Sequence, residues 1–209
     1  MEKIYVIGIG PGSREYLLPI AQRLVQGITY LVGGPRALEL FPDEEKTTHI
    51  INKDLSTTKN FIDTYWPDNK VAILVSGDVG FYSMLPWLKK HYPIEAIEVI
   101  PGISSLQVAF ARLKRPWQDA LLLSFHGRED NRVVAALEAG KTVGLLVNPK
   151  EAPDALVTEL RRVKKALSIY ILTNLSYENE KIEKLTIDEL DNFGLMENSV
   201  VVIFSDDSE

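Results

Sequence analysis

The sequence contains no cysteine, and this absence removes several kinds of chemistry at once. A disulfide, a thiolate nucleophile, an iron–sulfur cluster and a zinc–thiolate site are all excluded. Histidine is also scarce, because only His49, His91 and His126 are present and they lie far apart in the sequence. We therefore expect no histidine-rich site and no bound metal.

Long hydrophobic runs are missing as well. A membrane span needs about 18 consecutive apolar residues, and no stretch approaches this length, so we expect no membrane-spanning segment. The first ten residues, MEKIYVIGIG, lack the basic region and the extended apolar run of a signal peptide, and they predict a β-strand instead. We expect a cytoplasmic protein that does not bind membranes.

Positive charge is in short supply: 23 Lys and Arg residues face 29 Asp and Glu residues, which gives a formal net charge of −6. An acidic chain gains little from the phosphate field of nucleic acids, so broad binding of DNA or RNA is not expected. Local cations can still bind an acidic small molecule, because fields act locally. The 209 residues allow one domain or two small ones of ordinary soluble composition.

Short apolar runs alternate with longer amphipathic segments in the first half of the chain, which predicts an α/β fold with parallel strands covered by helices. The expected strands are residues 3–9, 28–32, 71–75 and 97–100, and the expected helices are residues 16–25, 35–40, 56–65, 81–90 and 103–113. The polar residues 42–49 are expected to form a loop, and Pro86 to shorten or kink its helix.

The second half of the chain ends in closely spaced strands, which predicts a mixed sheet. Its expected strands are residues 120–125, 143–147, 167–172, 182–185 and 199–204, with helices at residues 131–137, 154–163 and 187–192. The basic, proline-containing segment Lys114-Arg115-Pro116-Trp117 forms the expected joint. The predicted domains are residues 1–114 and residues 115–209.

Three glycine-containing loops follow predicted strands of the first domain. They are residues 8–12 (GIGPG), 76–82 (SGDVGFY) and 101–105 (PGISS). Ligands of open α/β sheets bind outside the carboxyl ends of the strands. We therefore expect the three loops to converge on one cleft.

The first loop matches a dinucleotide-binding fingerprint only in part, because that fingerprint needs glycines spaced G-x-G-x-x-G and an acidic residue after the second strand. Here residue 13 is serine, and the second predicted strand is followed by Gly33-Gly34-Pro35. Pro11 also removes a backbone N–H that a phosphate would need. For this loop, dinucleotide binding by a nicotinamide-dependent oxidoreductase is a weaker interpretation than a plain turn. It is also weaker than a loop whose backbone approaches a different ligand.

The other two loops each allow two interpretations. Asp78 is explained as a cap or turn residue, whereas Gly77 and Gly80 beside it would let the backbone approach a ligand. Ser104 and Ser105 are explained as caps of the next helix, or as hydroxyls that bind a carboxylate or ribose oxygen near the helix N-terminus.

In this order, the three loops resemble those of the tetrapyrrole methylase family. The resemblance covers nearly the whole chain. Within the family, the chain is similar to members that methylate carbon 5 of a precorrin in cobalamin biosynthesis. It is carried by VSGDVGFYS (75–83), PGISSLQ (101–107), PWQDA (116–120) and SFHGR (124–128). Two positions depart from the pattern: Val79 replaces the usual proline after the aspartate, and Phe125 replaces the usual leucine before the histidine.

The resemblance implies a two-domain fold, distinct from the Rossmann methyltransferases, with S-adenosylmethionine bound between the domains. Carried over by position, the cofactor contacts are Pro11, Asp78, Phe81, Ser104, Ser105 and Val147. It also implies a homodimer, cobalt-precorrin-7 as the corrinoid substrate, and a separate protein for methylation of carbon 15 and decarboxylation.

Methyl transfer from a sulfonium is an in-line displacement in which the ring carbon attacks, so the protein mainly supplies position and a dry site. No catalytic side chain is assigned. The carboxylates of the substrate require local cations, for which the candidates are Arg112, Lys114, Arg115, Arg128 and Arg132. Each is equally explained as a solvated surface charge. Arg128 and the neighbouring His126 are the predicted substrate contacts, and Trp117 is expected to pack at the joint.

Other functions stay open at this point. Within the family, the alternative targets of methylation are another precorrin carbon, a modified histidine and ribosomal RNA, although the net charge of −6 disfavours RNA. Outside the family, a binding module without catalysis remains an alternative.

Overall fold

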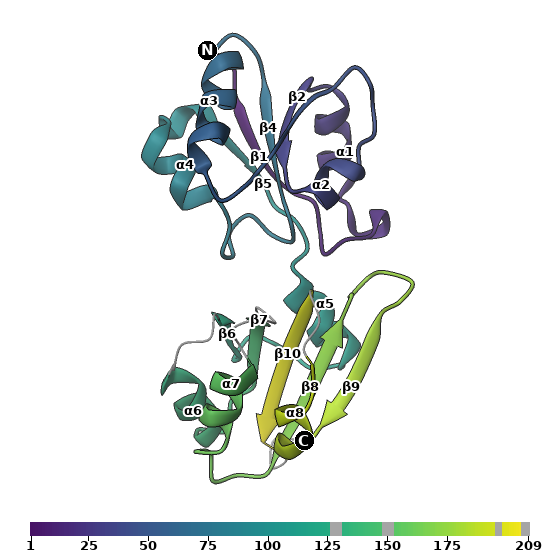
Figure 1. Cartoon of the computed structure of the whole chain (residues 1–209), viewed down its shortest axis with the longest axis vertical. Helices are drawn as coiled ribbons and strands as arrows, with labels where there is room; N and C mark the ends of the chain where they lie inside the picture. The colour runs from purple at the N-terminus through teal and green to yellow at the C-terminus, as the bar shows by residue number, and fades with distance from the viewer. Residues whose placement is uncertain (126–130, 148–152, 195–197, 206–209) are drawn as a thin grey trace. The chain divides into compact units, whose positions relative to one another are not determined.

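The computed structural model describes residues 1–125, 131–147, 153–194 and 198–205 (Figure 1). Internal contacts divide the chain into two compact units, Met1–Ser104 and Ser105–Glu209. The division lies ten residues before the predicted joint at residue 114, because helix α5 (Ser105–Arg112) packs against strands of the second unit. No helix within the described residues is long and apolar enough to cross a membrane.

A sheet of five parallel strands forms the centre of the first unit, as the strand–helix alternation predicted. Its spatial order is β3-β2-β4-β1-β5. The strands are β1 (Ile4–Gly8), β2 (Tyr30–Gly33), β3 (Thr47–Ile50), β4 (Val71–Val75) and β5 (Ile97–Ile100). All five side chains of β4 are buried, which is typical of a central strand covered on both faces.

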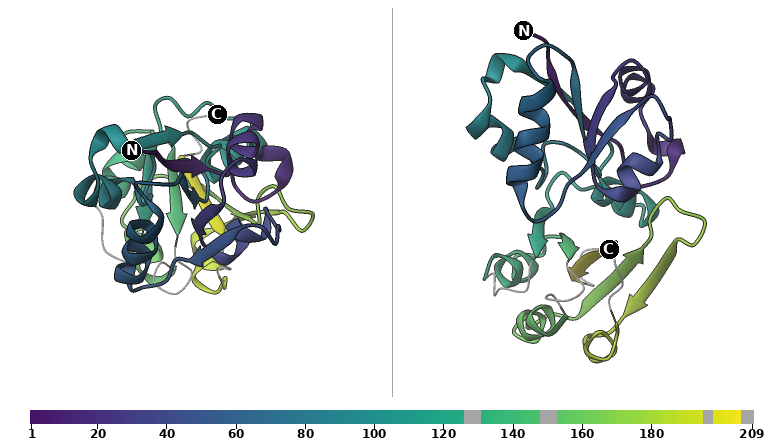
Figure 2. Two further views of the ribbon diagram at one scale, coloured as in Figure 1. Left: turned by 90° about the horizontal axis from the view of Figure 1, so that it is seen from above. Right: turned by 45° about the horizontal axis from the view of Figure 1, so that its top comes forward.

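Helices cover both faces of this sheet (Figures 1 and 2). The helical elements are η1 (Arg14–Tyr16), α1 (Pro19–Gln26), α2 (Pro35–Glu39), α3 (Leu55–Tyr65), α4 (Leu85–His91) and η2 (Ile94–Ala96). On one face, α1 and α2 pack on Ile7 and Leu74; on the other, α3 and α4 pack on Val6 and Ile73. Successive strand residues thus alternate between two apolar clusters, which fixes the sheet between two helical layers.

Three sequence-based expectations for the first unit were wrong in detail. Residues 47–50 form the edge strand β3 rather than a loop, and exposed Thr47 and Thr48 explain why no apolar pattern marked it. Helix α1 begins at Pro19, three residues after the expected start. Helix α4 begins at Leu85, four residues after the expected start at residue 81. Pro86 therefore lies in its first turn, where its missing N–H costs no hydrogen bond.

The second unit contains a mixed sheet, as predicted, and its spatial order is β6-β7-β10-β8-β9. Only β6 and β7 pair in parallel among its described strands. The strands are β6 (Leu121–Phe125), β7 (Val143–Val147), β8 (Leu167–Thr173), β9 (Lys181–Leu185) and β10 (Ser199–Ser205). Strand β10 lies between β7 and β8, and all seven of its residues are buried.

Helices cover this sheet as well. One apolar cluster joins the sheet to α6 (Asn131–Glu138), α7 (Pro153–Leu160) and α8 (Ile187–Asp191). Helix α5 packs against β7 and β10, where Phe110 and Leu106 lie so close to Gly144 that a Cβ at this position would come within 2.9 Å of Phe110. Gly144 is therefore needed for the close contact between α5 and the sheet.

Candidate functional site

The three glycine-containing loops of the first unit meet, as their positions in the sequence predicted. Strands β4, β1 and β5 are neighbours in the sheet and run in parallel, so the loops that follow them leave from one edge. Gly77 N–H donates a hydrogen bond of 2.7 Å to Gly10 O, and Gly10 and Gly77 form an isolated β-bridge. The first and second loops are thus joined through their backbones.

The third loop packs against the other two at glycine positions. A Cβ on Gly8 would lie 2.5 Å from Gly102 N and 2.7 Å from Gly77 O, distances that real Cβ atoms do not tolerate. Gly10 and Gly77 also adopt positive φ angles of 84° and 70°, which favour glycine. These glycines therefore let three backbones approach one another at the carboxyl edge of the sheet.

Asp78 links the second loop to the third. Its Oδ1 accepts a hydrogen bond of 2.8 Å from Gly80 N–H, and its Oδ2 accepts one of 3.1 Å from Gly102 N–H. The first bond is the local turn expected of an aspartate two residues before its donor. The second could not be foreseen from sequence, because Gly102 lies 24 residues further along the chain. The half-buried carboxylate therefore helps to fix the shape of the site.

Val79 replaces the proline expected at this position and is buried in the core, at 1% exposure. The loop is therefore anchored by apolar packing at the residue where the family pattern has a fixed φ angle. Ser83 Oγ adds a hydrogen bond back to Val79 O. The Asp78 loop is therefore held by the buried Val79 side chain and by the Ser83 hydrogen bond, although it lacks the proline.

Two aromatic side chains follow Asp78. Phe81 is half-buried, and its ring meets the Tyr82 ring edge-on with centroids 4.7 Å apart. Tyr82 is 60% exposed and has φ of 50°, a conformation that is strained for a bulky residue. Sequence reasoning selected Phe81 and missed Tyr82, since no local pattern marks a positive φ at a tyrosine.

The remaining predicted residues are placed as follows. Pro11 is half-buried in the first loop, and Ser104 directly precedes α5, in the third loop beside Gly77. Ser105 is the first residue of α5, and Val147 is the half-buried last residue of β7, both in the second unit. The structure thus brings Pro11, Asp78, Phe81 and Ser104 onto the three adjoining loops of the first unit. His126 and Arg128 lie outside the described residues.

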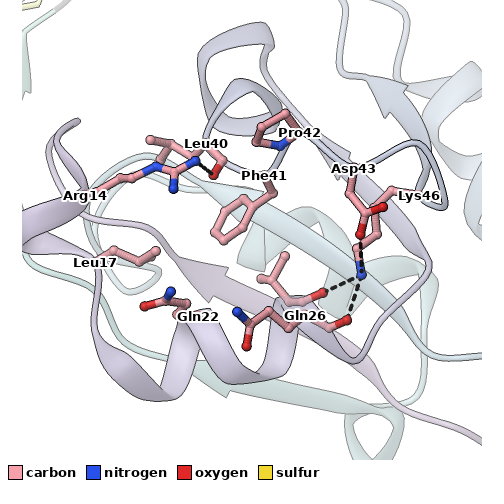
Figure 3. A pocket seen from close by; sticks show the side chains of 10 residues that line it. Arg14, Leu17, Gln22, Gln26, Leu40, Phe41, Pro42, Asp43 and Lys46 are labelled. Atoms are coloured by element: carbon pink, nitrogen blue, oxygen red, sulfur yellow. Dashed lines mark hydrogen bonds and ion pairs between the residues drawn. The ribbon is translucent and has the colours of Figure 1, made fainter.

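A cavity of about 410 Å³ lies elsewhere in the first unit, beside α1 and the segment that follows α2 (Figure 3). None of the predicted site residues lines it. Both of its cations are engaged: Arg14 donates to Leu40 O at 2.7 Å, and Lys46 donates to Gln26 O at 2.8 Å. Lys46 thereby binds carbonyls at the end of α1, which is a structural role.

The described residues contain no group of three or more acidic or histidine side chains that could hold a metal ion. Strand β2 ends at Gly33, followed by Gly34 and Pro35, so no carboxylate stands where a dinucleotide ribose would need one. The adjoining loops therefore offer backbone groups, one carboxylate, hydroxyls and aromatic rings. This donor set suits a small polar organic ligand rather than a metal.

The family profile of Tetrapyrrole (Corrin/Porphyrin) Methylases matches residues 3–191, and the chain belongs to this family. A probable cobalt-precorrin-7 C(5)-methyltransferase of Methanocaldococcus jannaschii is 37% identical over 212 residues, which cover 99% of each chain. The cobalt-precorrin-7 C(5)-methyltransferase of Salmonella typhimurium is 29% identical, over 95% of this chain and 97% of the relative.

The fold is that of solved members of the family. The structure of uroporphyrin-III C-methyltransferase from Thermus thermophilus, complexed with S-adenosylhomocysteine, superposes with a TM-score of 0.77 at 18% identity. The match covers 97% of each chain. The family and the two-domain α/β fold that the sequence motifs implied are thus confirmed.

Proposed function

We propose that this chain is an S-adenosylmethionine-dependent methyltransferase that acts on carbon 5 of cobalt-precorrin-7 in cobalamin biosynthesis. The observation that carries the proposal is the 37% identity, over 99% of both chains, to a relative with this probable activity. Family membership favours methyl transfer over the nicotinamide-dependent alternative, and β2 lacks the acidic residue which that alternative requires.

The residues of the first unit fit the proposed cofactor. The carboxylate of Asp78 has about four lone-pair positions, and two of them accept the backbone N–H groups of Gly80 and Gly102. The others remain available for hydroxyl or amino donors, and the negative charge favours a nearby sulfonium. We assign cofactor binding to Pro11, Asp78, Phe81, Ser104, Ser105 and Val147.

When bound, S-adenosylmethionine would supply an electrophilic methyl group on a sulfonium. The protein would hold that methyl in line with the attacking ring carbon and exclude water, so no side-chain nucleophile is required. Phe81 would contribute apolar surface, and the Gly80 and Gly102 N–H groups would hold the Asp78 carboxylate at a fixed position. We assign His126 and Arg128 to the carboxylates of the macrocycle.

Three further proposals accompany this assignment. We propose that the protein is cytoplasmic and a homodimer. We also propose that methylation of carbon 15 and decarboxylation are performed by a separate protein. The full-length match to a relative named for carbon 5 alone supports this last point.

The cofactor and the reaction are tested separately. S-adenosylhomocysteine at about 100 times its dissociation constant should add roughly 2.7 kcal/mol to the free energy of unfolding. An unchanged melting temperature at millimolar ligand would refute the cofactor assignment. Incubation with cobalt-precorrin-7 and S-adenosylmethionine should yield one added methyl group by mass spectrometry, placed on carbon 5 by NMR. A methyl on another carbon would replace the substrate assignment while leaving the cofactor assignment intact.

A further inference from the structure

Tyr82 combines two features that do not stabilise the fold. Its side chain is 60% exposed, although the ring is large and mostly apolar. Its backbone has φ of 50°, a conformation that costs free energy for L-residues and is rare for bulky ones. Single exposed apolar side chains need no explanation by themselves. An exposed ring on a strained backbone does need one.

The other described non-glycine residues with positive φ differ from Tyr82 in kind. They are Lys114, Asn174, Ser176 and Asn198. Asparagine tolerates this conformation because its short polar side chain can form local hydrogen bonds. Lys114 lies at the end of α5, where a left-handed residue commonly ends a helix. Tyr82 is the only aromatic residue among them, and neither its side-chain type nor a helix end accounts for its backbone.

Hydrogen bonds on both sides of Tyr82 hold this conformation. Phe81 N–H donates to Asp78 O at 3.4 Å, and Ser83 Oγ donates to Val79 O. Val79 is buried in the apolar cluster between the sheet and helices α3 and α4. The turn that strains Tyr82 is therefore anchored in the core, and it fixes the direction in which the ring leaves the loop.

The Tyr82 ring lies beside a side chain that we assign to the cofactor. Its centroid is 4.7 Å from that of Phe81, and the two rings meet edge-on at 83°. Phe81 is half-buried, whereas Tyr82 is exposed. Apolar ring surface of Tyr82 thus remains open to a ligand at the carboxyl edge of the first sheet, next to the loops that surround Asp78.

Resting on the methyltransferase function proposed above, we propose that Tyr82 is a substrate-contacting residue whose ring packs against the apolar face of the conjugated macrocycle. In-line methyl transfer requires the ring carbon to reach the methyl group, so the macrocycle must arrive beside the cofactor residues. Strained residues that the surrounding structure holds in place cluster at ligand-binding sites. A ring that is already fixed also loses little conformational freedom when it binds.

This contact divides recognition of the substrate into two parts. His126 and Arg128 are assigned to the carboxylates of the macrocycle, and Tyr82 recognises its apolar face. The ring would make this contact in both the ground state and the transition state, so it contributes to KM and not to kcat.

Two competing explanations give different results. If Tyr82 contacts the cofactor, its removal lowers the affinity for S-adenosylhomocysteine. If the ring only packs on Phe81 to support the loop, its removal lowers the melting temperature and leaves KM unchanged. A substrate contact changes KM while affinity for S-adenosylhomocysteine stays at the wild-type value.

The test is steady-state kinetics of the full chain with cobalt-precorrin-7 at saturating S-adenosylmethionine. Tyr82→Ala should raise KM about fivefold or more with unchanged kcat, as expected for a lost aromatic contact. Tyr82→Phe should keep the wild-type KM, because it retains the ring. Calorimetric titration should give both variants the wild-type affinity for S-adenosylhomocysteine. Tyr82→Gly should melt no lower than wild type, because glycine relieves the positive φ.

The matched control is Ile94→Ala, which removes a side chain of similar exposure, 55%, from η2 at the opposite edge of the sheet. Its KM should not change. An unchanged KM in Tyr82→Ala, an equal rise in Ile94→Ala, or a lowered affinity for S-adenosylhomocysteine would each overturn the inference while leaving the proposed function intact. A wild-type chain that does not methylate cobalt-precorrin-7 would overturn the proposed function, and the inference with it.

Discussion

Asp78 Oδ2 accepts a hydrogen bond of 3.1 Å from Gly102 N–H, and this single bond connects the loop after β4 to the loop after β5. Gly80 and Gly102 donate to different oxygens of Asp78, and asparagine places an NH₂ group at one of these two positions, where it would face a backbone N–H donor. We expect Asp78→Asn to lower the free energy of unfolding by about 1–3 kcal/mol. It should also weaken binding of S-adenosylhomocysteine about tenfold or more.

Differential scanning fluorimetry and calorimetric titration measure these two effects. Asp54→Asn is the matched control, because Asp54 uses one oxygen to cap α3 through Ser56 N–H, and asparagine caps equally well. A lowered melting temperature with unchanged affinity would mean that Asp78 shapes the loop without contacting the cofactor.

Gly8→Ala tests the close packing of the three loops. The new Cβ would lie 2.5 Å from Gly102 N, and backbone atoms on both sides cannot move away cheaply. We expect a loss of about 1–3 kcal/mol in urea denaturation. Gly27→Ala is the control, since its Cβ would meet its nearest neighbour at 3.8 Å with φ of −87°. Equal stability of the two variants would contradict the close approach of the three loops.

Glu180 should make stability depend on pH. Arg112 Nε donates to its Oε1 at 2.6 Å and Ser176 N–H to its Oε2 at 2.8 Å, and these bonds hold the pKa of Glu180 below its ordinary 4.5. Since the folded-state pKa is the lower one, the ionised carboxylate contributes stability that is complete above the unfolded value. That contribution is lost as the pH falls through the folded value.

Glu180→Gln is therefore expected to cost about 1 kcal/mol at neutral pH, the size of a good exposed ion pair. The difference from wild type should shrink as urea denaturation is repeated at pH values falling below 4.5. Glu178→Gln, at a neighbouring exposed residue, should show neither effect. A difference that is constant with pH would assign the loss to packing instead of charge.

Arg128→Ala should raise the KM for the polyacidic macrocycle about tenfold, because a charged hydrogen bond to a carboxylate is lost. Affinity for S-adenosylhomocysteine should not change. Arg36→Ala removes the same charge from the last turn of α2 and serves as the control. The measurement is steady-state kinetics at low salt. An equal KM for wild type and variant would mean that Arg128 is a solvated surface charge.

Sequence patterns predicted the elements that bury apolar side chains and missed those that do not. Strand β4 was found at its correct bounds because all five of its residues are apolar and buried. Strand β3 was missed because Thr47 and Thr48 face solvent, and the strand is held by pairing with β2. Backbone pairing leaves no mark on the sequence of an edge strand.

The candidate site shows the same division. The glycines and Asp78 stood out locally, and the parallel order of the strands predicted that their loops would converge. The partner Gly102 N–H and the strained Tyr82 depend on tertiary contacts and backbone angles that no short segment encodes. The predicted domain boundary follows Lys114 because Lys114 and Pro116 look like a linker, and the packing of α5 on the second sheet depends on tertiary contacts that these residues do not encode.

The position of β10 has a consequence for synthesis of the chain. The first unit has all five strands in place by residue 100, so it can begin to fold while the rest is being translated. The second sheet is different, because β7 and β8 both pair with β10, whose last residue is Ser205. Until that segment leaves the ribosome, two apolar strands lack their common neighbour and expose unpaired edges. The second unit is therefore the part of the nascent chain most in need of protection from aggregation.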